Sequence, residues 1–121
     1  MTKPKKTKAV AVIAYARHKT LPVSPQKARL VANQIRNKSI AHAFQILTFS
    51  KHKSAALIGK ALKSAVSNAV DAKGITDVSE LRVGEIYVNE GYTHKRFHVR
   101  GRGRGSRILK RTSHVTVGVS H

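Results

Sequence analysis

The sequence predicts a two-layer α+β fold of order β-α-α-α-β-β, with a small antiparallel sheet, three helices on one face, and a long protruding β-hairpin. Between residues 24 and 72, apolar residues recur at spacings of three and four, which is typical of helices packed on a core. From Glu80 the spacing changes to two, which is typical of strands. The basic stretch Tyr92–Thr112 separates the last two strands and predicts the hairpin. Helices segregated to one face of a sheet bury both kinds of apolar surface.

Length and charge favour a single domain, residues 1–121, with a polyanionic partner. A chain of 121 residues can build one modest core. Hydrophobic residues make up 40% of it, aromatic residues only 5%, and Trp is absent, which predicts a core of Ala, Val, Ile and Leu. The net charge is +19, from 24 Lys and Arg against 5 Asp and Glu. A compact body with this charge repels itself unless a polyanion neutralises it.

Several classes of protein are excluded or disfavoured. The chain has no Cys, so disulfides and thiolate metal sites are excluded. The apolar run Ala9–Arg17 is too short for a membrane span, and no small-residue cleavage site of a signal peptide follows it. An intracellular protein is therefore expected.

The first residues predict an arm and a strand. Residues 1–8, MTKPKKTK, indicate a flexible basic N-terminal arm. The loose alternation of Ala9–Arg17 predicts a strand. Prolines in the following HKTLPVSPQK predict a loop over His18–Val23.

Serine residues mark the expected starts of the helices. Ser24 followed by Pro25 predicts a helix that reaches about Arg36, because Ser is favoured at the N-cap and Pro at the first helical position. Ser39 is expected to cap the second helix, and Ser50 the third.

The third helix, Lys51–Ala72, is expected to be the longest, and Gly74 to end it in the left-handed conformation. The residues expected to face the core are Ala28, Val31 and Ile35 in the first helix, Ile40, Ala43, Phe44 and Leu47 in the second, and Ala55, Ile58, Leu62, Ala65, Val66 and Ala69 in the third.

Two strands flank the basic stretch. Before it, Leu81 and Val83 share one face, and the phase then slips by one residue at Gly84, which predicts a bulge. After it, Ser113–Ser120 alternates cleanly. The extended part of the arm is expected over Gly91–Arg107, where about eight residues on each side would reach roughly 26 Å from the body.

The arm has the chemistry of a nucleic-acid contact. Tyr92–Thr112 contains eight Lys or Arg residues and no carboxylate. Arg100, Arg102 and Arg104 alternate with glycines, so planar cationic groups occur where the backbone can approach phosphate closely. The run RGRGRG is not a nucleotide-binding loop, because the glycine spacing differs and no helix follows. A membrane-surface role is disfavoured, because no basic helix carries a large apolar face.

The histidines leave an enzyme as an alternative. An RNA-modifying enzyme or nuclease would use His94, His98 or His114 as general base. The carboxylates needed to complete such a site are confined to residues 71–90, and no nucleophile-elbow motif is present. Structural or RNA-facing histidines are favoured, and no catalytic residue, metal or cofactor is predicted.

RNA is the favoured polyanion. The sequence has no helix-turn-helix, zinc-finger or aromatic RNP motif. Basic loops and a long arm suit RNA of irregular shape, so the residues predict an architectural RNA-binding protein. A nucleoid-type DNA-compacting protein remains a third hypothesis.

Five motifs resemble the large-subunit ribosomal protein twenty-two family, bacterial type. They are SPQKARLV (24–31), ALKSAVSNAV (61–70), EIYVNEG (85–91), HKRF (94–97) and RILKRTSHVTV (107–117). The resemblance covers nearly the whole chain. It implies a structural constituent of the large ribosomal subunit whose body binds ribosomal RNA and whose hairpin lines the polypeptide exit tunnel.

The resemblance also implies particular residues and partners. The implied RNA-binding residues are Ser24, Lys27, Arg29, Lys95, Arg96, Arg100, Arg102, Arg104, Arg107, Lys110, Arg111, Thr112, Ser113 and His114. The implied partners are ribosomal RNA, neighbouring ribosomal proteins and the nascent polypeptide, without a membrane or cofactor. The implied location is the ribosome in the cytoplasm, bacterial rather than organellar.

Overall fold

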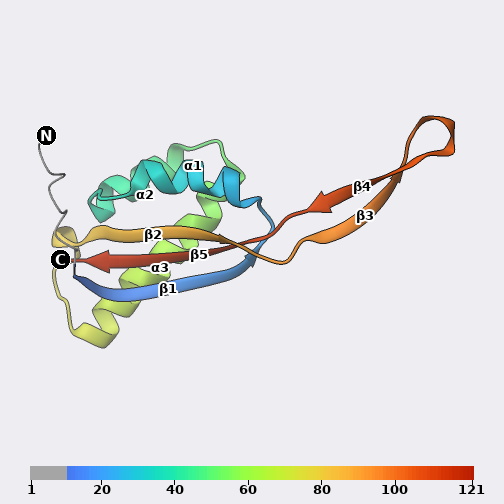
Figure 1. The fold of residues 1–121 in the computed structure, drawn as a ribbon. Coiled ribbons are helices and arrows are strands. Elements are labelled where there is room, and N and C mark those ends of the chain that lie inside the picture. The colour runs from blue at the N-terminus through green and yellow to red at the C-terminus, as the bar shows by residue number, and fades with distance from the viewer. Residues whose placement is uncertain (1–10) are drawn as a thin grey trace, which may run out of the picture.

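The computed structural model describes residues 11–121 and confirms the predicted fold class (Figure 1). The basic arm predicted for residues 1–8 lies outside the described residues. Along the chain, the elements are β1 (Val12–Leu21), α1 (Pro25–Ile35), α2 (Ile40–Phe49), α3 (Lys53–Lys73), a 3-10 turn (Val78–Glu80), β2 (Arg82–Glu90), β3 (His94–Val99), a turn (Gly101–Gly103), β4 (Gly105–Lys110) and β5 (Ser113–Ser120).

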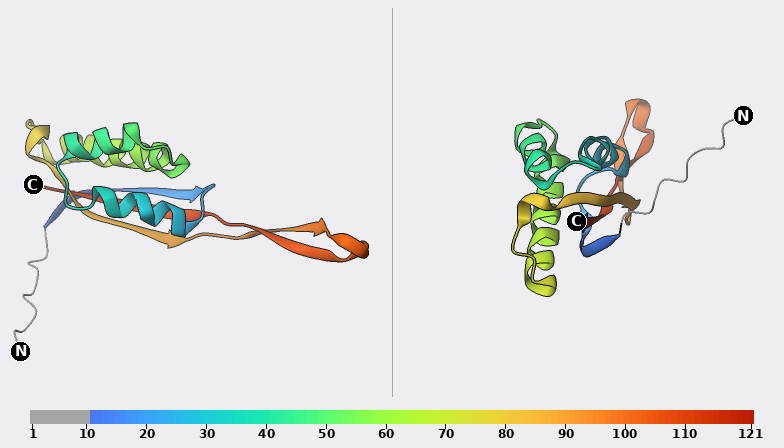
Figure 2. Two further views of the ribbon diagram at one scale, coloured as in Figure 1. Left: turned by 90° about the horizontal axis from the view of Figure 1, so that it is seen from above. Right: turned by 90° about the vertical axis from the view of Figure 1, so that its left-hand side faces the viewer.

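The body is one antiparallel sheet with helices on one side. The strand order is β1-β5-β2, so the last strand in sequence lies at the centre. Figure 2 shows α1, α2 and α3 gathered on one side of this sheet. The buried hydrophobic side chains between the two layers are all Ala, Val, Ile or Leu, as the composition predicted. None of the described helices combines the length and apolarity needed to cross a membrane.

Two of the three predicted helix caps are confirmed. Ser24 and Ser39 accept hydrogen bonds from the backbone N–H groups of Lys27 and His42, at 3.5 and 3.4 Å. Each bond satisfies a donor that the first helical turn cannot pair internally. Gly74 ends α3 in the left-handed conformation, with φ of 63°, as predicted.

The prediction that Ser50 caps the third helix was wrong. Ser50 ends α2, and α3 begins two residues after the predicted start, at Lys53, with His52 at its N-cap. The Ser50 hydroxyl accepts from the N–H of His52 at 3.4 Å, which holds a turn between the helices. The backbone of both Ser50 and His52 is extended, so neither can lie inside a helix.

The predicted end of the first strand was also wrong. β1 continues past Arg17 to Leu21, where a loop had been expected, because β5 provides pairing partners as far as Leu21 opposite Ser113. The register shifts between His18 and Leu21. Thr20 there has a φ of 58°, and its N–H donates to Nδ1 of His114 at 2.9 Å.

The bulge predicted at Gly84 is confirmed. The pairing of β2 with β5 shifts between Val83 and Glu85. A Cβ atom at position 84 would lie 2.8 Å from the Cβ and Oγ atoms of Ser120, which is closer than packed atoms approach. Only glycine fits here without displacing β5.

Candidate nucleic-acid interface

β3 and β4 form a separate two-stranded sheet that projects from the body as an arm (Figure 1). The pairing runs without a shift from His94 opposite Lys110 to Val99 opposite Gly105. Six residues at about 3.3 Å each make strands about 20 Å long. Such a narrow ribbon exposes most of its side chains, whatever their chemistry.

The strands are interrupted where the arm joins the body. The two chain segments come close together there, at Gly91, Tyr92 and Thr112, and this junction is called the pinch. The N–H of Gly91 donates to the carbonyl of Thr112 at 2.9 Å. The Thr112 hydroxyl donates to the carbonyl of Tyr92, so a side chain replaces a ladder bond where the two sheets separate. A Cβ at position 91 would lie 2.5 Å from Oγ1 of Thr112, so the chains approach this closely because residue 91 is glycine.

The tip of the arm presents three arginines. Arg102 and Gly103 take positive φ values of 59° and 70°, which close the turn. The Arg100 side chain donates from Nε to Oγ of Ser106 at 3.1 Å. Arg100, Arg102 and Arg104 are all exposed, and none is paired with a carboxylate among the described residues.

The shaft of the arm combines basic and apolar side chains. Phe97 lies across the arm over Gly105, where a Cβ would lie 1.6 Å from Cζ of the ring. The ring is nonetheless 72% exposed. Tyr92, Val99 and Leu109 are exposed as well. Lys95, Arg96, Arg107 and Lys110, predicted to bind RNA, are exposed along the same strands.

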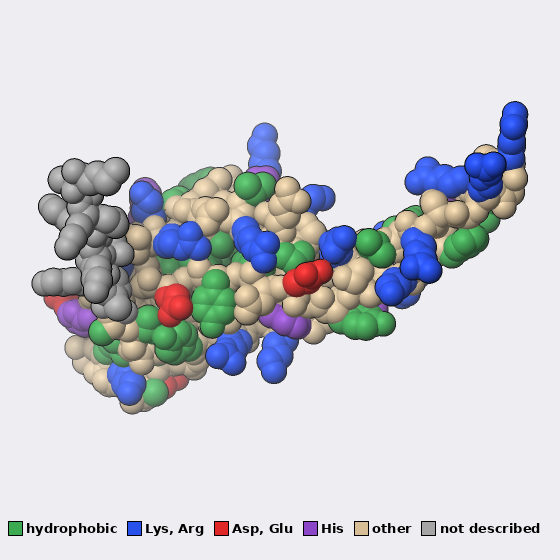
Figure 3. All heavy atoms as spheres, in the orientation of Figure 1, with side chains coloured by type: hydrophobic (Ala, Val, Ile, Leu, Met, Phe, Trp, Pro, Cys, Tyr) green, Lys and Arg blue, Asp and Glu red, His purple; other side chains and the backbone are tan. Residues whose placement is uncertain are grey.

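Charge is distributed unevenly between the arm and the body. Figure 3 shows Lys and Arg side chains along the whole arm, whereas acidic side chains lie on the body and at the base of the arm. Glu90 at the base pairs with Arg111 at 3.3 Å, and both side chains are substantially exposed. Beyond this pair, nothing acidic lies within Tyr92–Thr112 to offset its positive potential.

The base of the arm brings together residues that are far apart in the sequence. Ser24 and Arg29 from the start of α1 line one hollow of about 280 Å³ with Glu90 and Arg111. Lys27 is exposed on the same first turns of α1. The sequence motifs at 24–31 and 107–117 therefore meet at one place, next to the pinch.

Arg29 also has a structural task. Its Nε and a terminal guanidinium nitrogen donate to the carbonyl of Val88 at 3.2 and 3.0 Å. Arg36, the C-cap residue of α1, donates to the carbonyl of Ile86 at 2.8 Å. β2 is an edge strand of the sheet. The two arginines form hydrogen bonds with carbonyl groups that would otherwise be available to pair with a strand of another chain.

Replacing Arg29 with Met is expected to lower the free energy of unfolding of the RNA-free protein by about 1–2 kcal/mol, because a charge-assisted pair of hydrogen bonds is lost. Lys27→Met removes the same charge from an exposed site in the same helix and is expected to change it by less than about 0.5 kcal/mol. Chemical denaturation measures both. Equal stability of the two variants would contradict the structural role of Arg29.

Three of the predicted RNA-binding residues are more buried than expected. Thr112 and Ser113 are buried in the free protein, at 6% and 0% exposure, so their side chains offer little surface to a partner. His114 is half-buried, and its Nδ1 accepts the N–H of Thr20. Thr112 therefore holds the arm base through Tyr92, and His114 holds β1 through Thr20, whereas the buried Ser113 hydroxyl has no hydrogen-bond partner among the described residues. Thr112 lies against Gly91 at the pinch, and Ser113 and His114 lie in the central strand of the sheet, an arrangement that the sequence motif does not reveal.

The geometry does not assemble a catalytic site from the described residues. His94 lies edge-on to Tyr92, with ring centroids 5.0 Å apart, and His98 is exposed further along β3. No three His, Asp or Glu side chains among residues 11–121 are close enough to hold a metal ion.

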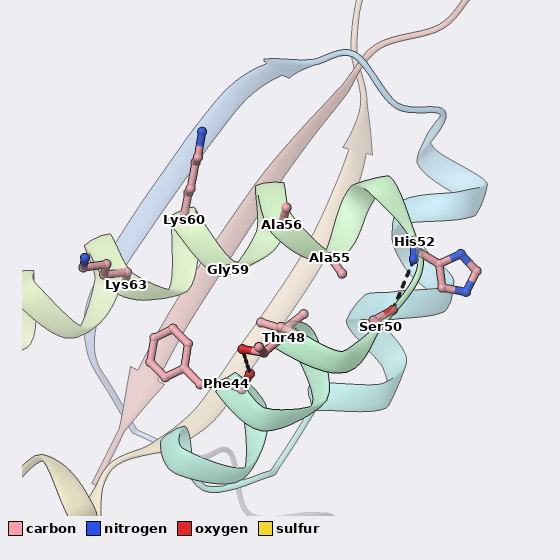
Figure 4. A pocket seen from close by; sticks show the side chains of 10 residues that line it. Phe44, Thr48, Ser50, His52, Ala55, Ala56, Gly59, Lys60 and Lys63 are labelled. Carbon is pink, nitrogen blue, oxygen red and sulfur yellow. Dashed lines mark hydrogen bonds between the residues drawn. The ribbon is translucent and has the colours of Figure 1, made fainter.

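A groove of about 360 Å³ between α2 and α3 contains no carboxylate either (Figure 4). Phe44, Gly59, Lys60 and Lys63 are among its lining residues.

Sequence reasoning missed a set of polar residues on the sheet. Tyr15, Arg17 and Lys19 alternate along β1 and are exposed on the side away from the helices. The alternation itself was the available signal, since Ala14 and Ala16, on either side of Tyr15, are buried. The predicted end of the strand at Arg17 excluded only Lys19, whereas Tyr15 and Arg17 lie inside the predicted strand and were not identified as site residues.

One comparison with known proteins bears on this arrangement. A family model described as ribosomal protein L22p/L17e matches residues 16–120. The match runs from within β1 to the last residue of β5, so it includes the three helices, the arm and the arm base.

Proposed function

The chain belongs to the ribosomal protein L22p/L17e family, and from this we propose that its arm and arm base bind and organise ribosomal RNA. The family consists of structural proteins of the large ribosomal subunit, not enzymes. The protein is accordingly a component of the ribosome and acts in translation. The observation that carries the proposal is the projecting arm with eight Lys or Arg residues and no carboxylate.

The mechanism is charge neutralisation. Each Lys or Arg that pairs with a phosphate releases condensed counterions, and this release drives association. Arg100, Arg102 and Arg104 at the tip and Arg111 at the base lie at opposite ends of the arm. A two-stranded ribbon between them can contact separate RNA segments at its two ends, which is an architectural role.

The finer placement follows from the resemblance in sequence. We propose that the arm lines the polypeptide exit tunnel of a bacterial-type ribosome, facing the nascent chain, while the body contacts neighbouring ribosomal proteins. A two-stranded ribbon is thin enough to enter a gap in folded RNA. Its exposed Phe97 and Val99 could contact bases or an emerging peptide without a large conformational change.

Binding to fragments of large-subunit RNA is expected to weaken steeply with salt. If about ten phosphates are engaged, the logarithm of affinity should fall against the logarithm of salt concentration with a slope near −7 to −9. A filter-binding titration measures the slope. A slope near zero would overturn the proposal, and equal affinity for duplex DNA would favour a DNA-compacting protein instead.

Stable association with the large subunit can be measured by sedimentation. The protein is expected to sediment with large ribosomal subunits after a high-salt wash, because contacts buried in folded RNA are screened less than exposed ones. Release at the same salt concentration as a loosely bound basic protein would argue against an architectural position.

A further inference from the structure

The sheet face that carries no helix, here called the open face, has a regular arrangement of side chains. Figure 1 shows the strands of the body in front of α3, so the open face is toward the viewer. Residues directly opposite each other on neighbouring strands point to the same side of a sheet. From the register, the rows on the open face are Tyr15, Gly118 and Glu85, then Arg17, Thr116 and Tyr87, then His114 and Asn89.

Tyr15 packs against the central strand of this face. A Cβ atom at Gly118 would lie 3.0 and 3.2 Å from Cε1 and Cδ1 of the Tyr15 ring, so the ring packs against the backbone of the central strand. The side chain is still 49% exposed, so about half of its surface is open to a ligand. Its hydroxyl reaches across β5 and donates to Oε2 of Glu85 at 3.2 Å. The ring is thus held at both ends before any ligand arrives.

The surroundings of Tyr15 are basic. Two shallow hollows of about 390 and 200 Å³ adjoin on this face. Arg17 and Tyr87 line both of them, and Lys19 lines the second. Figure 3 shows Lys and Arg side chains standing along the β1 side of the face. Glu85 is the one carboxylate in their lining, and it already accepts the Tyr15 hydroxyl.

We propose that the open face binds an unpaired RNA base by stacking on Tyr15, with Arg17 and Lys19 contacting the flanking phosphates. The choice of RNA as partner rests on the proposed function, but the site is new, lies on the body, and uses stacking rather than charge alone. An open aromatic surface accepts any base, while a duplex keeps its base faces buried within the stack. A preorganised ring loses little conformational freedom on binding, which favours this use.

The protonation state of Tyr15 is compatible with binding to a polyanion. Desolvation by neighbouring groups, the hydrogen bond to Glu85 and the charge of that carboxylate all raise the pKa of Tyr15. The phenol therefore stays neutral at physiological pH and does not repel phosphate.

The test uses the full-length protein and a single-stranded RNA decamer containing 4-thiouridine, titrated over a range of salt. Tyr15→Leu is expected to weaken binding by about 5- to 100-fold at every salt concentration, without changing the salt slope. Tyr15→Phe retains the ring and is expected to bind within about twofold of the original protein. Phe49→Leu is the matched control, because Phe49 is an 84% exposed aromatic residue at the end of α2, and it is expected to have no effect.

A second variant and a second measurement distinguish loss of the stacking site from misfolding of the Tyr15→Leu variant. Arg17→Gln leaves the ring intact and is expected to reduce the magnitude of the salt slope by about 0.7, as for one lost phosphate contact on a single strand. Photocrosslinking followed by mass spectrometry is expected to place a crosslink at Tyr15. Unchanged affinity of Tyr15→Leu, or crosslinks confined to Tyr92–Thr112, would overturn this inference.

The two proposals fail in different ways. If the salt slope is steep but Tyr15→Leu binds RNA with unchanged affinity, the proposed function is supported and only the stacking site is refuted. A salt slope near zero refutes the proposed function, whatever the RNA affinity of the Tyr15 variants.

Discussion

Replacing Arg100, Arg102 and Arg104 together by Ala is expected to weaken binding to large-subunit RNA fragments by about 100-fold at about 0.1 M salt. The salt slope should fall in magnitude by about 2–3, because each lost phosphate contact contributes about 0.7–0.9. The three side chains are exposed at the tip and contribute nothing to the core, so the melting temperature of the free protein should not change. Salt-dependent filter binding and thermal denaturation measure the two quantities.

The control for this variant removes the same charge elsewhere. Lys60, Lys63 and Lys73 are exposed on α3, and changing them to Ala lowers the net charge by the same three units. A smaller loss of affinity is expected, because these residues lie on the helical side of the body, away from the arm. If the two triple variants bind equally well, net charge alone governs binding and the arm has no special role.

Leu62→Ala is expected to lower the free energy of unfolding by about 2–5 kcal/mol. Leu62 is fully buried near the middle of α3, which packs on β1 and β5. Removing its side chain leaves a cavity that close-packed neighbours refill only in part. For a domain of this size the melting temperature should fall by about 10 °C or more. Calorimetry on RNA-free protein measures it, since bound RNA would mask the loss.

Lys63→Ala, one residue further along the helix, is the matched control. Lys63 is exposed, so its replacement should change the free energy of unfolding by no more than about 0.5 kcal/mol. A similar loss for both variants would contradict the role of core packing at Leu62, and helix propensity could not explain it, because Ala is the strongest helix former.

The helices were predictable because their signals are local. The apolar stripe of α3, with Ala55, Ile58 and Leu62, follows from the 3.6-residue period and is buried as expected. Caps at Ser24 and Ser39 need only the next three residues to form. The arm was predictable for a similar reason, because its charge and glycines are contiguous. Ser50 failed because the same hydroxyl can serve a turn as well as a helix start.

The sequence alone determined the fold class, the basic arm and, through its motifs, the family. It could not determine which residues of the arm base are accessible. Thr112 is buried at the pinch beside Gly91, and Ser113 is buried at the start of the central strand β5, so both depend on segments distant in the chain. Nor could it place Tyr15 over Gly118 and within reach of Glu85, 70 residues away in the chain. Register and strand pairing depend on partners distant in sequence, so only the tertiary structure decides them.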